Sequence, residues 1–266
     1  MIATIMQSYA TAGGQRPKAV IGWNRTTNEI CAGIPPLPEG FEHWILKFDG
    51  ADGEPKEYGR LEHAYAKMAQ SAGIDVPETS LIEENGRAHF LSKRFDRLAD
   101  GDRLHMHSLG GLLHVDYNKP RALDYTDYLT ATSQLTGDHT QVEQAYKRMV
   151  FNVMARNQDD HVKNFAYLMD KTGRWKLSPA FDITHANGAN WTSQHQMTIN
   201  GEARNIQNAD FIAVAKASGV RKPNVIVDEV SAALEQWPKF ASEAGVSAKR
   251  IDDIKAQFRW LSMAKT

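Results

Sequence analysis

Short alternating runs of β-branched, aromatic and aliphatic residues dominate the first 97 residues. They predict β-strands over residues 19–23, 44–48, 80–83 and 87–92. Asn85-Gly86 separates the last two runs and predicts a two-residue hairpin turn, because both central positions of a type I′ turn need positive φ. A helical segment from Leu61 to about Ala72 is ended by Gly73.

From Asp124 onward the apolar positions recur with a helical period. Residues 141–156 carry an unbroken stripe at i, i+3, i+4, i+7, i+8, i+11 and i+12, so we expect a helix buried on one face. Further helices are predicted over residues 209–217, 225–236 and 248–263, the last capped by Ser247. The predicted fold class is therefore α+β, with a small β-rich lobe (residues 1–97) and a larger, mainly helical lobe (residues 98–266).

Two carboxylates and an amide follow the buried helical stripe at suggestive positions. Asp159 and Asn164 stand in a D-x-x-x-x-N spacing, and the residues after them predict a hairpin, with strands over 165–169 and 174–177. Asp182 follows the hairpin. We expect the three side chains to lie together at the hairpin ends. The alternative is that Asp159, Asp160 and Asn164 are turn and cap residues that end the helix at Arg156.

Such a set suits phosphoryl transfer, in which the protein mainly positions groups and neutralises charge. Asp159 is the candidate base that accepts the proton of the attacking hydroxyl. Asn164 and Asp182 offer the oxygen ligands that Mg²⁺ prefers. The order of catalytic loop, hairpin and second aspartate is the one that protein kinases use.

A lysine upstream belongs to the same chemistry. Lys47 lies on a predicted strand among apolar residues, and Glu62, in the first turn of the predicted helix, is its candidate partner, because a buried lysine is costly unless paired. Alternatively, Lys47 lies at a sheet edge with its charged end in water. The segment before the first strand offers backbone N–H groups for phosphates, or is an ordinary surface turn. Its candidate nucleotide-binding residues are Ala12, Gly13, Gly14, Gln15, Arg16 and Lys18.

Composition narrows the class of protein. Thirty-one Lys and Arg residues against 32 Asp and Glu residues leave a net charge of -1, which provides no global basic field for nucleic acid. A 42% hydrophobic content favours a packed core over disorder, and a single cysteine, Cys31, cannot form an internal disulfide. The sequence shows no targeting segment and no apolar run long enough to span a membrane, so we expect a cytoplasmic protein.

Several other features are interpreted as structural. His105 and His107 share one side of a predicted strand, but no tetrahedral metal set completes them. Residues 105–117 are interpreted as core and pocket lining, and Trp191 as part of an exposed loop without an assigned role. The basic residues 216, 221 and 222 are interpreted as a solvated face, with DNA contact as the alternative.

Taken together, these residues resemble the HipA-like serine/threonine kinases, a family that includes toxins of bacterial toxin–antitoxin systems. The resemblance runs from about Gln7 to Ala186 and rests on residues 11–18, 93–97 and 159–164, with Lys47 and Phe181-Asp182. It implies a kinase-like two-lobed fold, Asp159 as base, Asn164 and Asp182 on Mg²⁺, and Lys47 on the α- and β-phosphates of ATP. It also implies that residues 12–18 cover ATP and that further residues contact the nucleotide: Arg94, Phe95, His161 and Lys163.

The chain departs from the family in two places. Longer members carry an N-terminal subdomain before the glycine-containing loop, so we expect it to be missing here or supplied by a separate small protein, as in the HipT type. Family members autophosphorylate a serine where this chain has Ala10, and whether Ser8, Tyr9 or Thr11 replaces it is left open.

The resemblance implies an ATP- and Mg²⁺-dependent serine/threonine protein kinase that acts as the toxin of a type II toxin–antitoxin system. Its implied substrate class is an aminoacyl-tRNA synthetase, and its implied partner is an antitoxin that binds DNA, so that the kinase meets DNA only indirectly. Two alternatives stay open: a small-molecule kinase, and a non-catalytic kinase-like module that acts through an antitoxin–DNA complex.

Overall fold

The first half of the chain forms an antiparallel sheet. The computed structural model describes residues 16–50, 56–98 and 101–261. Within these residues five strands pair in the order β2-β1-β3-β5-β4. They are β1 (Lys18–Asn24), β2 (Glu29–Ala32), β3 (Glu42–Lys47), β4 (Thr79–Glu84) and β5 (Arg87–Lys93). The four predicted strands are confirmed to within two residues. Strand β2 was not predicted, because four residues at a sheet edge carry too short a pattern.

The turn between β4 and β5 is the one that the sequence predicts. Asn85 has φ 51° and Gly86 has φ 76°, so both central residues adopt the left-handed conformation that a type I′ turn requires. Glu84 pairs with Arg87 across the turn, which places the register of the whole hairpin.

Helix α2 (Tyr58–Ser71) begins three residues before the predicted start. The carboxylate of Asp49 accepts hydrogen bonds from the backbone N–H groups of Glu57 (3.2 Å) and Tyr58 (3.0 Å), at the N-terminal end of the helix. This cap comes from a neighbouring strand end, so the local pattern does not reveal it. As a result Glu62 lies in the second turn of the helix, which corrects its expected place in the first.

The second half of the chain is mainly helical, as predicted. Helix α5 (His139–Met154) buries every residue of the predicted apolar stripe. The other helices are α3 (Leu109–Leu112), α4 (Tyr125–Thr136), η1 (Asn190–Ser193), α6 (Asn208–Ala217), α7 (Pro223–Glu235), α8 (Trp237–Glu243) and α9 (Ala248–Lys255). The predictions for α6 and α7 are confirmed to within two residues, whereas α8 was not predicted.

The end of the described chain corrects two expectations. Helix α9 stops at Lys255 and does not reach Met263, because the chain turns there and buries Phe258 against Trp237, with ring centroids 5.9 Å apart. Ser247 precedes α9 without capping it through its side chain. Its hydroxyl instead contacts Glu57 Oε2 at 3.2 Å, at the start of α2.

A smaller sheet lies beside the helices. Strands β6 (His105–Ser108), β7 (Ala166–Met169) and β8 (Trp175–Leu177) pair in that order, which confirms the predicted hairpin. Residues 105–117, which we expected to form core and pocket lining, are only partly buried. Leu109 is buried, but Met106 and Leu113 are each 39% exposed. The described residues contain no group of three or more His, Cys, Asp or Glu side chains placed to hold a metal ion.

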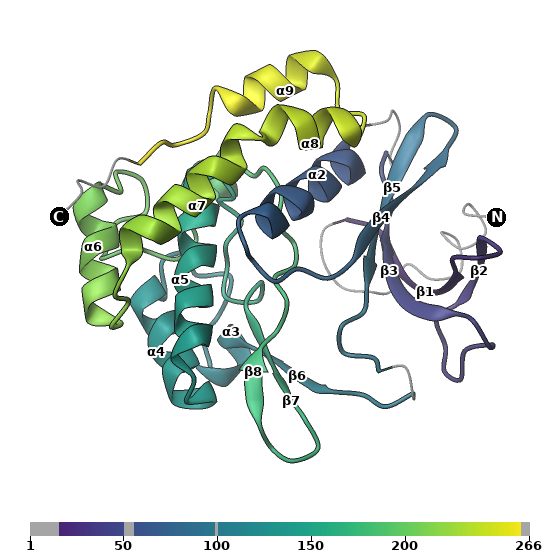
Figure 1. Ribbon diagram of the computed structural model, residues 1–266, viewed down its shortest axis with the longest axis horizontal. Coiled ribbons are helices and arrows are strands. Elements are labelled where there is room, and N and C mark those ends of the chain that lie inside the picture. The colour runs from purple at the N-terminus through teal and green to yellow at the C-terminus, as the bar shows by residue number, and fades with distance from the viewer. Residues whose placement is uncertain (1–15, 51–55, 99–100, 262–266) are drawn as a thin grey trace.

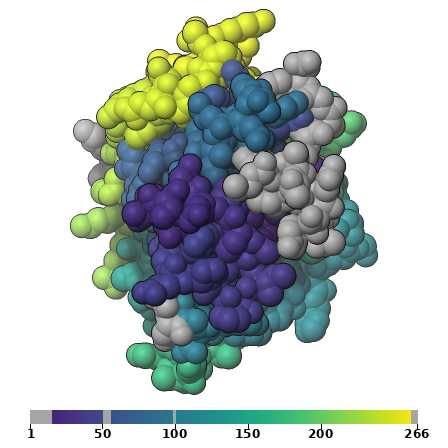
Figure 2. All heavy atoms as spheres, turned by 90° about the vertical axis from the view of Figure 1, so that its right-hand side faces the viewer, coloured from purple at the N-terminus to yellow at the C-terminus, as the bar shows by residue number. Residues whose placement is uncertain are grey.

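Helix α2 lies between the larger sheet and the C-terminal helices (Figure 1). Its buried residues, among them Tyr65 and Met68, belong to the same hydrophobic core as α4 to α7. A second, smaller core within the larger sheet contains Trp23 and Trp44, whose rings meet edge to face at 5.0 Å. Strands from the first fifty residues occupy the centre of the face in Figure 2, and the C-terminal segment lies along its top. The lobe boundary after Arg97 stays a prediction.

No helix in the described ranges combines the length and the apolar character needed to cross a bilayer.

Candidate active site

Lys47 forms ion pairs with carboxylates from both halves of the chain. It is the last residue of β3, and its side chain is only 12% exposed. Its ammonium group lies 2.5 Å from Glu62 Oε1 and also contacts Asp182 Oδ1. Burial on its own would lower the pKa of Lys47, but the two carboxylates more than offset this and raise the pKa above its ordinary value. The lysine therefore stays charged inside the protein.

Asp182 reaches Lys47 from the loop after β8. It has φ 53°, a left-handed conformation uncommon for a residue with a side chain, and such residues concentrate at functional sites. Burial tends to raise the pKa of Asp182, but Lys47 outweighs this and holds the pKa below its usual range. The preceding Phe181 packs against Phe95, with ring centroids 5.8 Å apart, and so ties this loop to the end of β5.

Asp159 lies in the loop between α5 and β7. Its Oδ1 accepts a hydrogen bond from the indole N–H of Trp191 at 2.7 Å and lies 3.9 Å from His161 Nε2. Burial raises the pKa of Asp159, while the Trp191 hydrogen bond and His161 oppose the rise. The helix before it ends at Met154 with Ala155 at its C-cap, so Asp159 is not the residue that caps it.

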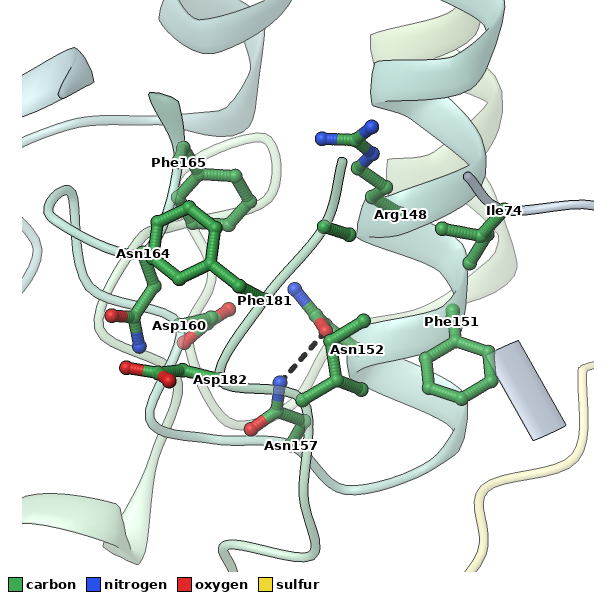
Figure 3. Close-up of a pocket in the computed structure, with 12 residues that line it drawn as sticks. Ile74, Arg148, Phe151, Asn152, Asn157, Asp160, Asn164, Phe165, Phe181 and Asp182 are labelled. Atoms are coloured by element: carbon green, nitrogen blue, oxygen red, sulfur yellow. Dashed lines mark hydrogen bonds between the residues drawn. The ribbon is translucent and has the colours of Figure 1, made fainter. Parts of the chain in front are cut away.

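Asn164 is oriented by the loop that carries Asp159. Its Nδ2 donates to the carbonyl oxygen of Asp159 at 2.8 Å, which leaves the amide oxygen available. Asn164 and Asp182 line one small cavity of about 20 Å³. Figure 3 shows the polar ends of Asn164, Asp160 and Asp182 gathered on one side of it, with Phe151 and Ile74 on the other.

A larger cavity of about 290 Å³ opens beside this cluster. Lys47, Glu62 and Asp182 line one charged end of it, and four other charged residues also line the cavity: Lys18, Lys93, Arg94 and Asp96. Its apolar wall consists of side chains from both halves of the chain: Ile45, Ala66, Phe90, Phe95, Met106 and Ile183. A cavity that combines apolar walls with convergent charged groups is typical of a small-molecule site.

Arg94 and Phe95, expected near a nucleotide base, both line the larger cavity. The Arg94 guanidinium is held by a fork of hydrogen bonds to Asp96, at 2.9 and 2.6 Å, and Asp96 also accepts from Arg97. Those two arginines keep the pKa of Asp96 low despite its burial. Arg94 is thus held in place by Asp96, whose single carboxylate it shares with Arg97.

The other candidate nucleotide contacts are placed less uniformly. Lys18 lines the larger cavity, and Arg16 stacks on the Tyr58 ring, 3.8 Å from Glu62 Oε2. His161 lies beside Asp159, and Lys163 Nζ lies 3.2 Å from the centre of the Tyr117 ring, so neither lines that cavity. The candidate residues Ala12, Gly13, Gly14 and Gln15 lie outside the described residues, as do Ser8, Tyr9, Ala10 and Thr11.

The sequence did not reveal the buried polar network around Asp160, the neighbour of Asp159. Asp160 is buried and accepts from the Tyr125 hydroxyl (2.8 Å), from His195 Nδ1 (2.8 Å) and from the backbone N–H of Gln196 (2.7 Å). Trp191, which had no assigned role, contacts Asp159 directly. The available signal was the adjacent pair Asp159-Asp160: Asp160 is buried and lines the small cavity, whereas the Asp159 side chain is 41% exposed and lines neither cavity.

Comparison with known proteins identifies the family to which the chain is similar. The HipA-like C-terminal domain family matches residues 10–237, beyond the region that carried the resemblance. A putative kinase of Haemophilus influenzae is 28% identical over 145 residues, covering 48% of this chain and 42% of that protein. Putative kinase Y4mE of Sinorhizobium fredii is 24% identical over 204 residues, which cover 70% of this chain and 48% of that protein. The chain thus spans about half the length of these curated relatives.

Two solved structures share the fold. One is HipA of Shewanella oneidensis MR-1, in a toxin–antitoxin complex with HipB and operator DNA, with a TM-score of 0.72 and 16% identity over 93% of this chain and 63% of that one. The other is the proinflammatory kinase CtkA of Helicobacter pylori, with a TM-score of 0.51 and 14% identity, covering 84% of this chain and 89% of that one. The predicted two-lobed, kinase-like fold is confirmed.

Proposed function

Because the chain belongs to the HipA-like C-terminal domain family, we propose that it is a kinase that transfers the γ-phosphate of ATP to a hydroxyl group. The observation that carries this proposal is the position of Lys47. It joins Glu62 of α2 to Asp182 of the second half at the charged end of a cavity. Asn164 shares the small cavity with Asp182 and donates to the backbone carbonyl of Asp159, whose own side chain lines neither cavity. Phosphoryl transfer needs such a lysine–glutamate pair and a metal-binding aspartate in place together.

The larger cavity is the proposed ATP site. Its apolar wall suits a purine ring, and its charged end suits phosphates. Lys47 would hold the α- and β-phosphates, and Lys18, at the start of the neighbouring strand, adds a further cation to the lining. Glu62 keeps the Lys47 side chain extended toward that end, so the cation is oriented before the nucleotide binds.

Asn164 and Asp182 would hold Mg²⁺, and the donor set fits this ion. The hydrogen bond from Asn164 Nδ2 to the Asp159 carbonyl leaves an amide oxygen, and Asp182 adds a carboxylate in the same small cavity. Hard oxygen ligands of this kind, completed by water and phosphate, are those that Mg²⁺ selects. When bound, the ion would neutralise the charge of the phosphates.

Asp159 would accept the proton of the attacking hydroxyl. Its side chain is 41% exposed, so an acceptor can reach it from solvent. We propose that the acceptor is a serine or threonine of a protein, of the aminoacyl-tRNA synthetase class, and that the outcome is growth arrest. Positioning of the reactants and proton transfer would supply the catalysis, and the charge of Lys47 would stabilise the α- and β-phosphates that remain on the nucleotide.

We further propose that the protein is the toxin of a type II toxin–antitoxin system in the cytoplasm, neutralised by an antitoxin that binds DNA. The structurally similar HipA occurs with HipB and operator DNA, which supports such a partner. The net charge of -1 gives this chain no general attraction to DNA, which supports an arrangement in which the antitoxin makes the DNA contacts.

The test is transfer of labelled γ-phosphate to purified aminoacyl-tRNA synthetases in the presence of Mg²⁺. Asp159→Asn and Asp182→Asn should each reduce the rate at least about 100-fold, because each removes a group that acts on the transferred phosphate or the proton. Asp228→Asn, at an exposed position on α7, is the matched control and should leave the rate unchanged.

Three results would change the proposal. Undiminished transfer in both variants would contradict the residue assignments. ATP turnover stimulated by a small hydroxyl compound, without protein labelling, would make the protein a small-molecule kinase. Binding of ATP without transfer to any acceptor would make it a non-catalytic module.

A further inference from the structure

Trp191 lies in the segment that follows Asp182. Among the described residues, its side chain is the one that donates a hydrogen bond to the Asp159 carboxylate. Its indole N–H reaches Asp159 Oδ1 at 2.7 Å. Within the described residues no side-chain or backbone donor reaches Asp159 Oδ2, and 41% of the side chain is exposed. The two oxygens of the proposed base are therefore unequal: Oδ1 is engaged by the protein, and Oδ2 is not.

The segment that carries Trp191 is anchored from the buried side. Asp160, the neighbour of the proposed base, holds His195 and the backbone of Gln196 through hydrogen bonds of 2.8 and 2.7 Å. Gln196 Nε2 then donates to the carbonyl oxygens of Trp191 (2.5 Å) and Gln194 (2.9 Å). Since Asp160 and Gln196 are 1% and 3% exposed, this anchor is shielded from competing water.

The adjacent carboxylates thus have different tasks. Asp159 faces outward, and Asp160 faces inward and holds the segment whose tryptophan returns to Asp159. His161 continues the same side of the loop, with its ring 6.4 Å from the Trp191 ring and its Nε2 3.9 Å from Asp159 Oδ1. The Oδ1 side of the base is consequently closed by two rings.

We propose that Trp191 is a positioning residue for the acceptor: by engaging Oδ1 of Asp159, it turns Oδ2 toward the hydroxyl group that is to be phosphorylated. This inference rests on the proposed kinase function. Trp191 does not line the larger cavity, so its effect falls on the transfer step and leaves nucleotide binding unaltered. A side chain that orients a general base acts on the rate at saturating substrate, because the orientation is needed in the transition state.

The first experiment compares Trp191→Phe with Trp260→Phe in the full chain. The first variant keeps an aromatic ring and removes the N–H donor, and the second changes an exposed tryptophan in the C-terminal segment. We expect kcat for phosphate transfer to fall about 10- to 100-fold in Trp191→Phe, with KM for ATP within about twofold of the wild type. Trp260→Phe should match the wild type in both constants.

A lowered melting temperature with unchanged kcat in Trp191→Phe would overturn the inference, because Trp191 would then be only structural. The inference would also be overturned if Trp191→Phe lost activity through a higher KM for ATP, with kcat unchanged. A wild type that transfers no phosphate would instead contradict the proposed function, and the contact itself would still be open to a measurement without turnover.

That measurement is the indole N–H spectrum of the six tryptophans, recorded by nuclear magnetic resonance for the wild type and for Asp159→Ala. Loss of the acceptor should move one indole resonance, the one that is missing from Trp191→Phe. If no indole resonance moves in Asp159→Ala, the hydrogen bond is not formed in solution and the proposal fails, whether or not Trp191→Phe folds.

Discussion

Lys47 is stable inside the protein only because carboxylates from two distant segments meet it. Glu62 is 4% exposed and lies 2.5 Å from the ammonium group, and Asp182 contacts the same group from the other side. A buried charge without a partner costs several kcal/mol, so each member of this cluster depends on the others. The cluster also concentrates like charges: without the lysine, two carboxylates would share one site.

Lys47→Met should therefore affect both stability and nucleotide binding. We expect the free energy of unfolding to fall by about 1–3 kcal/mol, reduced from the fully buried case because Asp182 is 36% exposed. We also expect at least about 10-fold weaker ATP binding, because the cation proposed for the phosphates is gone. Urea unfolding and nucleotide titration measure the two effects. Adding Glu62→Gln should recover part of the lost stability, and a further loss would contradict the argument.

At the scale of elements, α2 decides where Glu62 stands. Asp49 caps its first turn, Tyr65 donates its hydroxyl to the Ala155 carbonyl at 2.8 Å, and Arg60 donates to the Ala244 carbonyl at 2.9 Å. The helix is thereby attached to the sheet at one end and to the C-terminal helices along its length. Two of its supports, Ala244 and Ser247, lie beyond the region that the family match covers.

Asp49→Ala removes the cap of α2 and should lower the free energy of unfolding by about 1–2 kcal/mol, because the helix N–H groups lose a buried acceptor. Chemical denaturation measures this. Asp49→Asn keeps an acceptor oxygen and should lose less than Asp49→Ala. Equal losses in the two variants would contradict the capping role.

Gly59→Ala tests whether α2 sets the ion pair. A Cβ atom at this position would lie 2.1 Å from the Ala88 carbonyl oxygen of β5, so the helix must move away from the sheet. We expect a loss of about 1–3 kcal/mol in stability and a raised KM for ATP, because Glu62 moves with the helix. Lys67→Ala, on the exposed side of the same helix, is the control and should leave KM unchanged. An unaltered KM in Gly59→Ala would separate the helix position from the ion pair.

At the scale of the whole molecule, histidines held neutral make the fold sensitive to acid. Burial, with Lys67 nearby, lowers the pKa of His63 to about 4, and burial likewise lowers the pKa of His43, His89 and His185. In the unfolded chain these groups have the ordinary pKa near 6.5, so the unfolded state binds more protons between the two values. Their contribution to stability is complete above about pH 6.5 and is lost as the pH falls toward 4.

We therefore expect the free energy of unfolding to decline between pH 6.5 and pH 4, with His63 alone contributing about 2 kcal/mol after allowance for its partial exposure. Urea denaturation at several pH values gives the slope. His63→Gln keeps a polar contact to Thr79 within reach and should flatten the curve in this window. A parallel curve for the variant would show that His63 does not titrate as described.

The order of most elements and the set of candidate site residues could be derived from the sequence, because periodicity, turn chemistry and short spacings are local. The α5 stripe, the Asn85-Gly86 turn and the spacing of Asp159 and Asn164 all belong to this class. Errors arose where a distant segment decided the outcome. The start of α2 depends on Asp49, the end of α9 on the burial of Phe258, and the role of Trp191 on a contact 32 positions away in the chain.

The sequence by itself therefore determined the α+β class, the family and the set of candidate groups, because each of these is carried by local pattern or by ordered motifs. Only the tertiary structure decided which groups meet. Lys47 and Asp182 are 135 positions apart, and no local sequence pattern reveals that the C-terminal end of β3 lies against the loop after β8. Likewise, the sequence does not distinguish Asp159 from Asp160. Hydrogen bonds from Tyr125, His195 and Gln196 turn the Asp160 carboxylate inward, whereas the Asp159 side chain stays 41% exposed.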